Sequence, residues 1–182
     1  MDRLQKVAVL TELADRMRER GSWCGETHLQ KAAYFLQDLL GVSLDFDFVL
    51  YKHGPFSFDL REELAAMRAD GLLELEPQEE PYGPKLVPTP RSKELRDRYP
   101  KTLGRFNKPI SFVADKLGEK GATALERLGT AFYMKQKHHN LDDESLAKRI
   151  NQFKPHVLVE SAKNALREVR EISSEAKKFK AA

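Results

Sequence analysis

The dipeptide Gly54–Pro55 restricts the fold most, because it separates a segment of alternating residues from a helical one. Before it, the run LDFDFVLYK (44–52) alternates apolar and polar residues and predicts a short, half-buried strand. Glycine permits turn conformations that other residues resist, and proline has no backbone N–H, so we expect the pair to end this strand. Ser57 then caps a helix whose apolar positions are Leu60, Leu64 and Met67. We predict a structural turn made by Tyr51, Lys52, His53, Gly54 and Pro55.

The elements around this turn follow a recognisable order. Helical spacing predicts helices at about 2–20 and 27–41, the second opened by a capping box of Thr27 and Gln30. Residues 73–76 and 85–88 are strand-like, and Thr89–Pro90 opens another helix. Helix, helix, strand, helix, strand, loop, strand, helix is the order of a winged-helix domain, with the wing at 72–88.

After Pro100 the pattern is wholly helical. Two helices break around Gly118 to Gly121, and two more cover LDDESLAKRIN and PHVLVESAKNALREVREI. We therefore predict a mainly α fold with a small antiparallel β wing. A winged-helix-like domain at 1–100 would be followed by a helical extension at 101–182.

Composition narrows the class of protein. Hydrophobic residues make up 41% and charged residues 32% of the chain, and there is no apolar run of membrane-spanning length. The charged N-terminus is unlike a signal peptide, so we expect a cytoplasmic protein without a membrane partner. Charge is unevenly distributed: residues 1–80 carry a net −7 and residues 81–182 a net +10. This split suggests two surfaces with different partners, or two halves that attract each other.

Three short motifs resemble those of a known family. HLQKAAYFLQ, LYKHGPFS and the helix that ends in DGLLELE are similar to segments of the YwgA-like proteins and, more distantly, of the Panacea-domain (SocA-like) antitoxins. The resemblance covers roughly residues 25 to 90, with His53 where an aromatic residue is expected. It implies a winged-helix-related fold and a non-enzymatic role in bacterial regulation or defence, beside a toxin or another effector.

The residues capable of catalysis or metal binding form no convincing constellation. Cys24 and His28 could pair as nucleophile and base, but no orienting residue stands at a recognisable spacing, and a buried structural cysteine is the better interpretation. A second cluster comprises His138, His139, Asp142, Asp143 and Glu144, with His156 further on. Its spacing matches no metal motif, and a helix cap at Asp142 or Asp143 explains it more simply. We expect no catalytic residue, no metal and no cofactor.

The helix at 57–70 would be the DNA-reading helix of a winged-helix domain, but its charge is unsuitable. Arg61 and Arg68 are outnumbered by Asp59, Glu62, Glu63 and Asp70. Carboxylates placed among phosphates raise the free energy of binding to DNA. We therefore predict that this helix binds a protein partner, a toxin or defence effector, through Arg61, Glu62, Glu63 and Arg68. Two alternatives for this helix stay open: it has an ordinary solvated face, or it contacts the chain's own basic half.

The best nucleic-acid candidate lies after the wing. Residues 91–108 carry a net +5, and Tyr99 and Phe106 are interleaved with basic residues, a pattern that suits single-stranded or phosphate-rich partners. The alternative function is thus a nucleic-acid-binding regulator that uses this segment and the basic C-terminal helices. A homo-oligomer also stays open. The basic residues of the segment are Arg91, Lys93, Arg96, Arg98, Lys101, Arg105 and Lys108.

Overall fold

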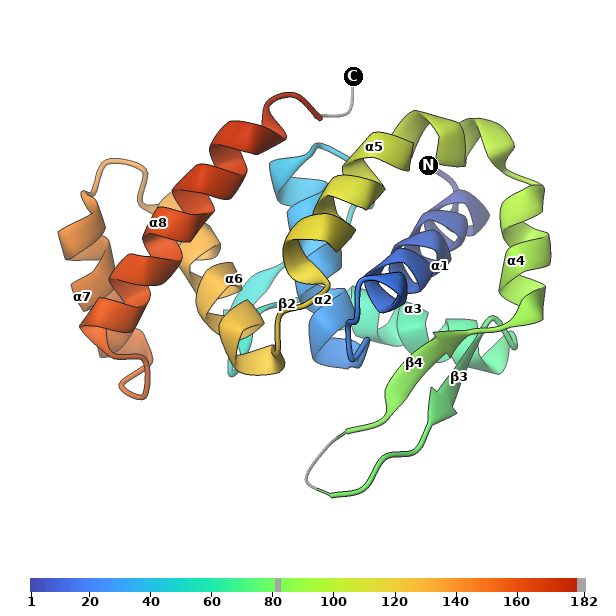
Figure 1. Cartoon of the computed structure of the whole chain (residues 1–182), viewed down its shortest axis with the longest axis horizontal. Coiled ribbons are helices and arrows are strands. Elements are labelled where there is room, and N and C mark those ends of the chain that lie inside the picture. The colour runs from blue at the N-terminus through green and yellow to red at the C-terminus, as the bar shows by residue number, and fades with distance from the viewer. Residues whose placement is uncertain (81–82, 180–182) are drawn as a thin grey trace.

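The computed structural model describes residues 1–80 and 83–179. Figure 1 shows a mainly helical molecule from which one β-hairpin projects. The first part of the chain forms α1 (Arg3–Glu19), α2 (Glu26–Tyr34), the π-helical turn η1 (Phe35–Leu39), β1 (Val49–Tyr51), β2 (Gly54–Phe56), α3 (Phe58–Ala69), β3 (Leu73–Glu76), β4 (Lys85–Pro88) and α4 (Pro90–Asp97). The second part forms α5 (Pro100–Leu117), α6 (Ala122–Lys137), α7 (Asp143–Phe153) and α8 (Val159–Ala176). The predicted class, mainly α with a small antiparallel β part, is confirmed.

Local side-chain chemistry explains where several helices begin. Ser57, Thr89 and Asp142 each accept a hydrogen bond from the backbone N–H three residues later. These bonds satisfy N–H groups that have no partner inside the first turn of a helix. Pro90 follows Thr89 as the first helical residue, where a missing N–H costs nothing. The predicted caps of α3, α4 and α7 are confirmed.

The predicted capping box of α2 is wrong. Its N-cap is Gly25, which has no side chain to offer, and the helix begins at Glu26 rather than at Thr27. Gln30 is buried and bonds both backbone groups of Ser57 instead: Nε2 donates to the carbonyl at 2.9 Å and Oε1 accepts from the N–H at 2.9 Å. These two long-range bonds satisfy both backbone groups of Ser57, and they fix the start of α3 against α2.

The first hairpin differs from the predicted long strand. β1 contains only residues 49–51, and it pairs antiparallel with β2 in the register Val49↔Phe56, Leu50↔Pro55 and Tyr51↔Gly54. Gly54 and Pro55 therefore begin a second strand, and the reversal occurs at Lys52 and His53. Gly54 and Pro55 are buried against α6, a contact that local sequence does not reveal.

The second hairpin contains the predicted strands 73–76 and 85–88. β3 and β4 are antiparallel, in the register Leu73↔Pro88, Glu74↔Val87, Leu75↔Leu86 and Glu76↔Lys85. This hairpin is the one that projects from the helical body in Figure 1. Residues 81 and 82 of the predicted tip lie outside the described residues.

One buried apolar cluster connects the two predicted domains. α5 packs along α1, α6 contacts α2 and β2, and α7 and α8 pack together with α6. The cluster extends from Val7 in α1 to Ala176 in α8. Within the described residues, no helix combines the length and the apolar character needed to cross a bilayer.

Candidate partner-binding groove

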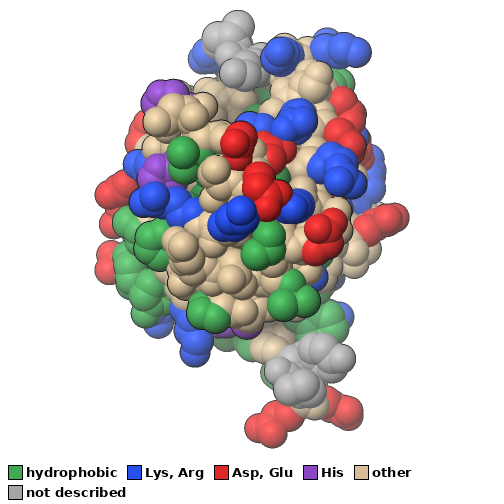
Figure 2. All heavy atoms as spheres, turned by 90° about the vertical axis from the view of Figure 1, so that its left-hand side faces the viewer, with side chains coloured by type: hydrophobic (Ala, Val, Ile, Leu, Met, Phe, Trp, Pro, Cys, Tyr) green, Lys and Arg blue, Asp and Glu red, His purple; other side chains and the backbone are tan. Residues whose placement is uncertain are grey.

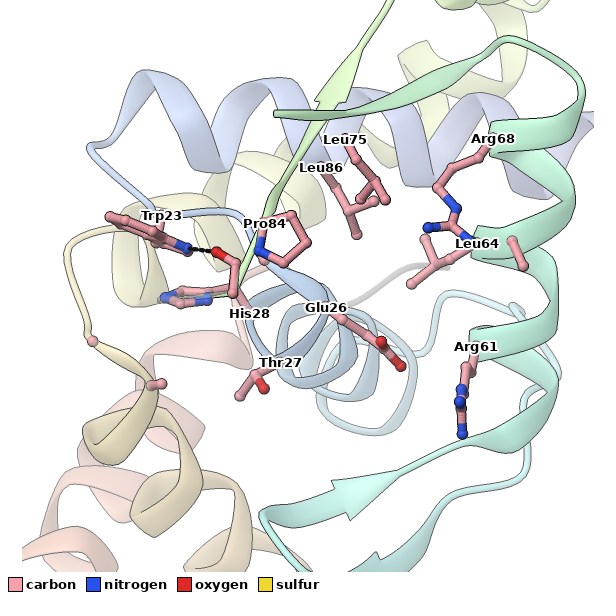
Figure 3. A pocket seen from close by; sticks show the side chains of 15 residues that line it. Trp23, Glu26, Thr27, His28, Arg61, Leu64, Arg68, Leu75, Pro84 and Leu86 are labelled. Atoms are coloured by element: carbon pink, nitrogen blue, oxygen red, sulfur yellow. Dashed lines mark hydrogen bonds between the residues drawn. The ribbon is translucent and has the colours of Figure 1, made fainter. Parts of the chain in front are cut away.

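A surface groove of about 780 Å³ lies between α2, α3 and the β3–β4 hairpin (Figure 3). Trp23 and the first turn of α2 form one wall, α3 forms the opposite wall, and the hairpin closes one side. We call this feature the groove. Its lining includes Trp23, Glu26, Thr27, His28, Arg61, Leu64, Ala65, Arg68, Leu75, Pro84 and Leu86.

The face of α3 that lines the groove is cationic although the helix as a whole is acidic. Arg61, Leu64, Ala65 and Arg68 recur three or four positions apart, so they share one face of the helix. Figure 3 shows both arginines extending from this face. Glu26 is the acidic residue of the opposite wall, which leaves the lining with a surplus of positive charge.

The acidic residues of α3 lie elsewhere. Glu63 accepts a hydrogen bond from Nε of Arg3 at 3.0 Å, and Arg3 also pairs with Asp70 at 2.9 Å. α1, rather than the basic C-terminal half, therefore neutralises part of the acidic charge of α3. Glu62 is exposed and is not part of the groove lining. Of the four predicted partner-binding residues, Arg61 and Arg68 line the groove, whereas Glu62 and Glu63 do not.

The groove has apolar side chains between its charged ones. Leu75 and Leu86 are opposite each other in the β3–β4 ladder, so both side chains lie on the same face of the hairpin. Leu64 extends toward this face from α3 (Figure 3). Leu75 is 42% exposed, a large value for a leucine in a strand. An occupant of the groove would cover this leucine and thereby gain hydrophobic stabilisation.

Trp23 and His28 form the inner end of the groove. The indole N–H of Trp23 donates to the carbonyl of Gly83 at 3.1 Å, and the ammonium of Lys85 lies 4.8 Å from the indole ring centroid. His28 is buried beside them, and neither ring nitrogen is in hydrogen-bond geometry with another described residue. Burial is the main influence on the pKa of His28 and lowers it, so the imidazole is neutral at neutral pH.

The structure does not join Cys24 to His28 as nucleophile and base. Cys24 is wholly buried, and its Sγ donates to the carbonyl of Ala14 at 3.6 Å. Burial raises the pKa of the thiol to about 12. Because the thiolate is the reactive form, this cysteine is a poor nucleophile at neutral pH. The interpretation of Cys24 as a buried structural residue agrees with this geometry.

The predicted turn at 51–55 lies over a buried ionic cluster. Glu126 of α6 accepts hydrogen bonds from Lys154 at 2.9 Å and from His156 at 3.1 Å, and Nδ1 of His53 is 3.5 Å from its other oxygen. Lys154 also donates to the carbonyl of Lys52. Burial alone would raise the pKa of Glu126, but the bond and charge of Lys154, together with the bonds of His156 and His53, outweigh it and hold that pKa below its usual range.

An exposed aromatic patch flanks this turn. Tyr51, Phe56 and Phe58 contact one another edge-on or tilted, with ring centroids 5.1 to 5.6 Å apart. Tyr51 is 54% and Phe58 49% exposed. Side chains of this kind are enriched in protein interfaces because they bury much area with little loss of conformational entropy.

The predicted nucleic-acid segment occupies α4 and the start of α5, and Arg96 is not available to a phosphate. Its guanidinium pairs with Asp15 and, at 3.4 Å, with Glu12 of α1, and its side chain is only 12% exposed. Arg96 thus joins the basic segment to α1, which lies in the acidic half of the chain. The other six basic residues are exposed: Arg91, Lys93, Arg98, Lys101, Arg105 and Lys108.

The basic C-terminal helices do not present a uniform positive surface. Figure 2 views the molecule from the α7–α8 end and shows acidic and basic side chains interspersed there. Lys163 pairs with Glu144, and Arg170 pairs with Asp143. Phosphate binding favours a continuous basic patch, which these pairs interrupt.

The residues considered as metal ligands are dispersed. Asp142 caps α7, Asp143 and Glu144 form the ion pairs just named, and His156 bonds to Glu126. Within residues 1–80 and 83–179, no three His, Cys, Asp or Glu side chains are gathered in a way that could hold a metal ion.

No protein-family model matches this chain, and no curated protein is significantly similar to it in sequence.

Proposed function

We propose that the chain is a non-enzymatic interaction module that binds a protein partner in the groove. The order of α1, α2, α3, β3, β4 and α4 supports a winged-helix-related scaffold, with the β3–β4 hairpin as the wing. On this proposal the space between the third helix and the wing holds a segment of protein. The resemblance to antitoxin-like families agrees with a bacterial regulatory or defence role.

The combination of charged and apolar groups in the groove carries the proposal. Arg61 and Arg68 lie on one wall, the exposed side chain of Leu75 offers apolar area, and Trp23 closes the end. Arginine forks bind carboxylates in a bidentate geometry, and partly exposed leucines are stabilised when a partner covers them. The partner segment should therefore carry acidic and apolar side chains.

The charges of α3 favour a protein over duplex DNA. A helix in the major groove needs cationic or amide side chains along its exposed face, but exposed Asp59, Glu62 and Asp70 would then approach phosphates. The two arginines of the helix point into the groove instead of supplying a phosphate-binding surface.

Affinity purification followed by calorimetry tests the proposal. A tagged chain is purified from its host, the protein that co-purifies is produced separately, and the affinity of the two is measured. Changing Arg61→Gln with Arg68→Gln should weaken binding at least about tenfold. The matched control changes Arg91→Gln with Arg98→Gln, which removes the same charge outside the groove and should leave the affinity unchanged. Equal effects of the two pairs would contradict the proposal.

Nucleic-acid binding by α4 and α5 is the second candidate function, favoured by the exposed basic residues of these helices. Lys101 and Lys108 are both exposed at the start of α5, and Arg98 lies just before it. If these residues contact phosphates, changing the three to Gln lowers the affinity for single-stranded RNA or DNA and reduces its dependence on salt. Filter binding at several salt concentrations measures both effects.

A further inference from the structure

The backbone of β3 has an outer edge that is open for pairing. Within the described residues its sheet contains only β3 and β4. The other side of β4 is occupied, since the N–H of Leu86 donates to the carbonyl of Cys24 at 2.9 Å. In a strand the N–H and C=O of one residue point to the same side, so both groups of Leu86 face away from β3.

This bond determines the kind of pair that Leu86 makes with Leu75. Because Leu86 directs its backbone groups toward Cys24, Leu75↔Leu86 is a pair without hydrogen bonds between its members. Leu75 then directs its own N–H and C=O to the outer edge of β3. The ladder between the strands is made by the alternate residues, Glu74 and Glu76, with Val87 and Lys85.

Two further observations support the same alternation in the direction of the backbone groups along β3. The N–H of Thr89 donates to the carbonyl of Leu72 at 3.2 Å, so Leu72, three positions before Leu75, faces β4. Pro88 is opposite Leu73, and a proline fits only where the strand needs no inward N–H. The backbone N–H and C=O groups of Leu73 and Leu75 therefore both face the outer edge of β3. Of the two residues, Leu75 is the exposed one.

Resting on the proposed function, we propose that an extended segment of the protein partner pairs antiparallel with the outer edge of β3. A residue opposite Leu75 would exchange two backbone hydrogen bonds with it. Alternate side chains of the segment would lie on the same face as Leu75, which is the face that lines the groove. An apolar residue opposite Leu75 and an acidic residue two positions further, toward Arg68, would complement the lining.

Charge argues for a different protein rather than a second copy of the chain. Two β3 strands that pair antiparallel about Leu75 would bring Glu74 of each copy opposite Glu76 of the other. Like charges directly opposite each other destabilise a strand pair. A partner with lysine or arginine at these two positions would instead be attracted. The segment expected at β3 thus alternates apolar and acidic residues on one face with basic residues on the other.

A capped synthetic peptide, in which valine and aspartate alternate with lysine, is the probe for this pairing. N-methylation of the valine opposite Leu75 removes an N–H that faces β3, and binding should weaken about tenfold or more. N-methylation of the adjacent lysine, whose N–H faces away, is the matched control and should leave binding within about twofold of the parent peptide. These two peptides test the pairing on the unaltered chain.

Variants of β3 provide a second test of the strand pairing. Leu75→Pro removes only the outward N–H and keeps the ladder to β4, so it should abolish peptide binding without lowering the melting temperature by more than a few degrees. Leu75→Val retains the N–H and should still bind. Equal affinities for the two N-methylated peptides, or no binding of the parent peptide at millimolar concentration, would overturn the pairing.

The remaining outcomes separate this inference from the proposed function. In one outcome, changing Arg61 and Arg68 to Gln abolishes peptide binding, but N-methylation of the peptide has no effect. This result would leave the groove as a binding site and overturn only the strand pairing. A concentration-dependent dimer that Leu75→Pro converts to monomer would show self-pairing and overturn the choice of a different protein as occupant. Peptide titrations detect the first outcome, and light scattering on the purified chain detects the second.

Discussion

Nζ of Lys154 lies 2.9 Å from Oε1 of Glu126, and both side chains are almost wholly removed from solvent. The pair connects α6 to the segment that joins α7 and α8. Through the further bond of Lys154 to the carbonyl of Lys52, it also holds the turn between β1 and β2. Three separate parts of the chain therefore depend on one ion pair.

Glu126→Gln should destabilise the fold, because it leaves the ammonium of Lys154 buried without an anionic partner. Loss of one member of a buried pair typically costs about 3 kcal/mol of unfolding free energy. Urea unfolding measures the cost. Lys148→Gln, which removes a lysine of the exposed Lys148–Glu144 pair, is the control and should change stability by less than about 0.5 kcal/mol. A cost for Glu126→Gln as small as that of the control would contradict the role assigned to the pair.

Lys31 should make stability depend on pH in the alkaline range. It is 1% exposed, and burial lowers its pKa to about 8 although Glu126 partly opposes this effect. Below pH 8 the lysine is charged in both states, and its burial costs free energy. Between about pH 8 and 10 the folded state releases the proton while the unfolded state retains it, so stability rises with pH.

Lys31→Met removes this dependence and should stabilise the fold at pH 7 by about 2 kcal/mol. The measurement is urea unfolding of both proteins from pH 7 to 10. The difference between their unfolding free energies reports on Lys31 alone, because Cys24 and Tyr34 are present in both proteins. A difference that is constant over this range would show that the buried ammonium is compensated.

Gly54→Ala should cost more than the same change at another glycine with a similar backbone conformation. Gly54 has φ +87°, and a Cβ there would lie 3.2 Å from both the Glu126 carbonyl oxygen and Oγ1 of Thr130. Gly21 has φ +82° with nothing within 4 Å of such a Cβ. Gly21→Ala therefore measures backbone strain alone, about 1 kcal/mol, and Gly54→Ala should exceed it by at least about 1 kcal/mol. Thermal unfolding of the two variants gives the comparison.

Arg96→Gln should lower stability rather than nucleic-acid affinity. The change leaves Asp15 without its cation in a partly buried site, while Glu12 keeps its pair with Arg16 at 2.7 Å, and we expect a cost of about 2 kcal/mol. Arg98→Gln, two positions away and exposed, is the control and should be neutral within about 0.5 kcal/mol. An unchanged unfolding curve for Arg96→Gln would contradict the structural role of this arginine.

The sequence predicted those features that depend on neighbouring residues. Ser57, Thr89 and Asp142 cap helices because each bond closes within three residues. The predicted capping role of Gln30 is wrong because its actual partner, Ser57, is 27 positions away. The net charge of α3 can be read from the sequence, but it does not reveal that the arginines line the groove while Glu62 and Glu63 do not.

Other features had no signal in the sequence. Lys154 and Glu126 are 28 positions apart, and neither stands in a motif. The sequence pairs His28 with nothing except Cys24, whereas the structure places it in the groove wall. The outward direction of the Leu75 backbone follows from a hydrogen bond between Leu86 and Cys24, which no periodicity predicts.

Photocrosslinking from within the groove tests the central claim most directly. Ala65 is exposed on the groove face of α3 and can carry a photoreactive amino acid without disturbing a buried contact, and Lys93 on α4 is the matched exposed position outside the groove. In cells of the host, illumination should link one discrete protein to position 65 and not to position 93. A nuclease-sensitive adduct at position 93, with no protein adduct at position 65, would contradict a protein-binding groove and favour the nucleic-acid function instead.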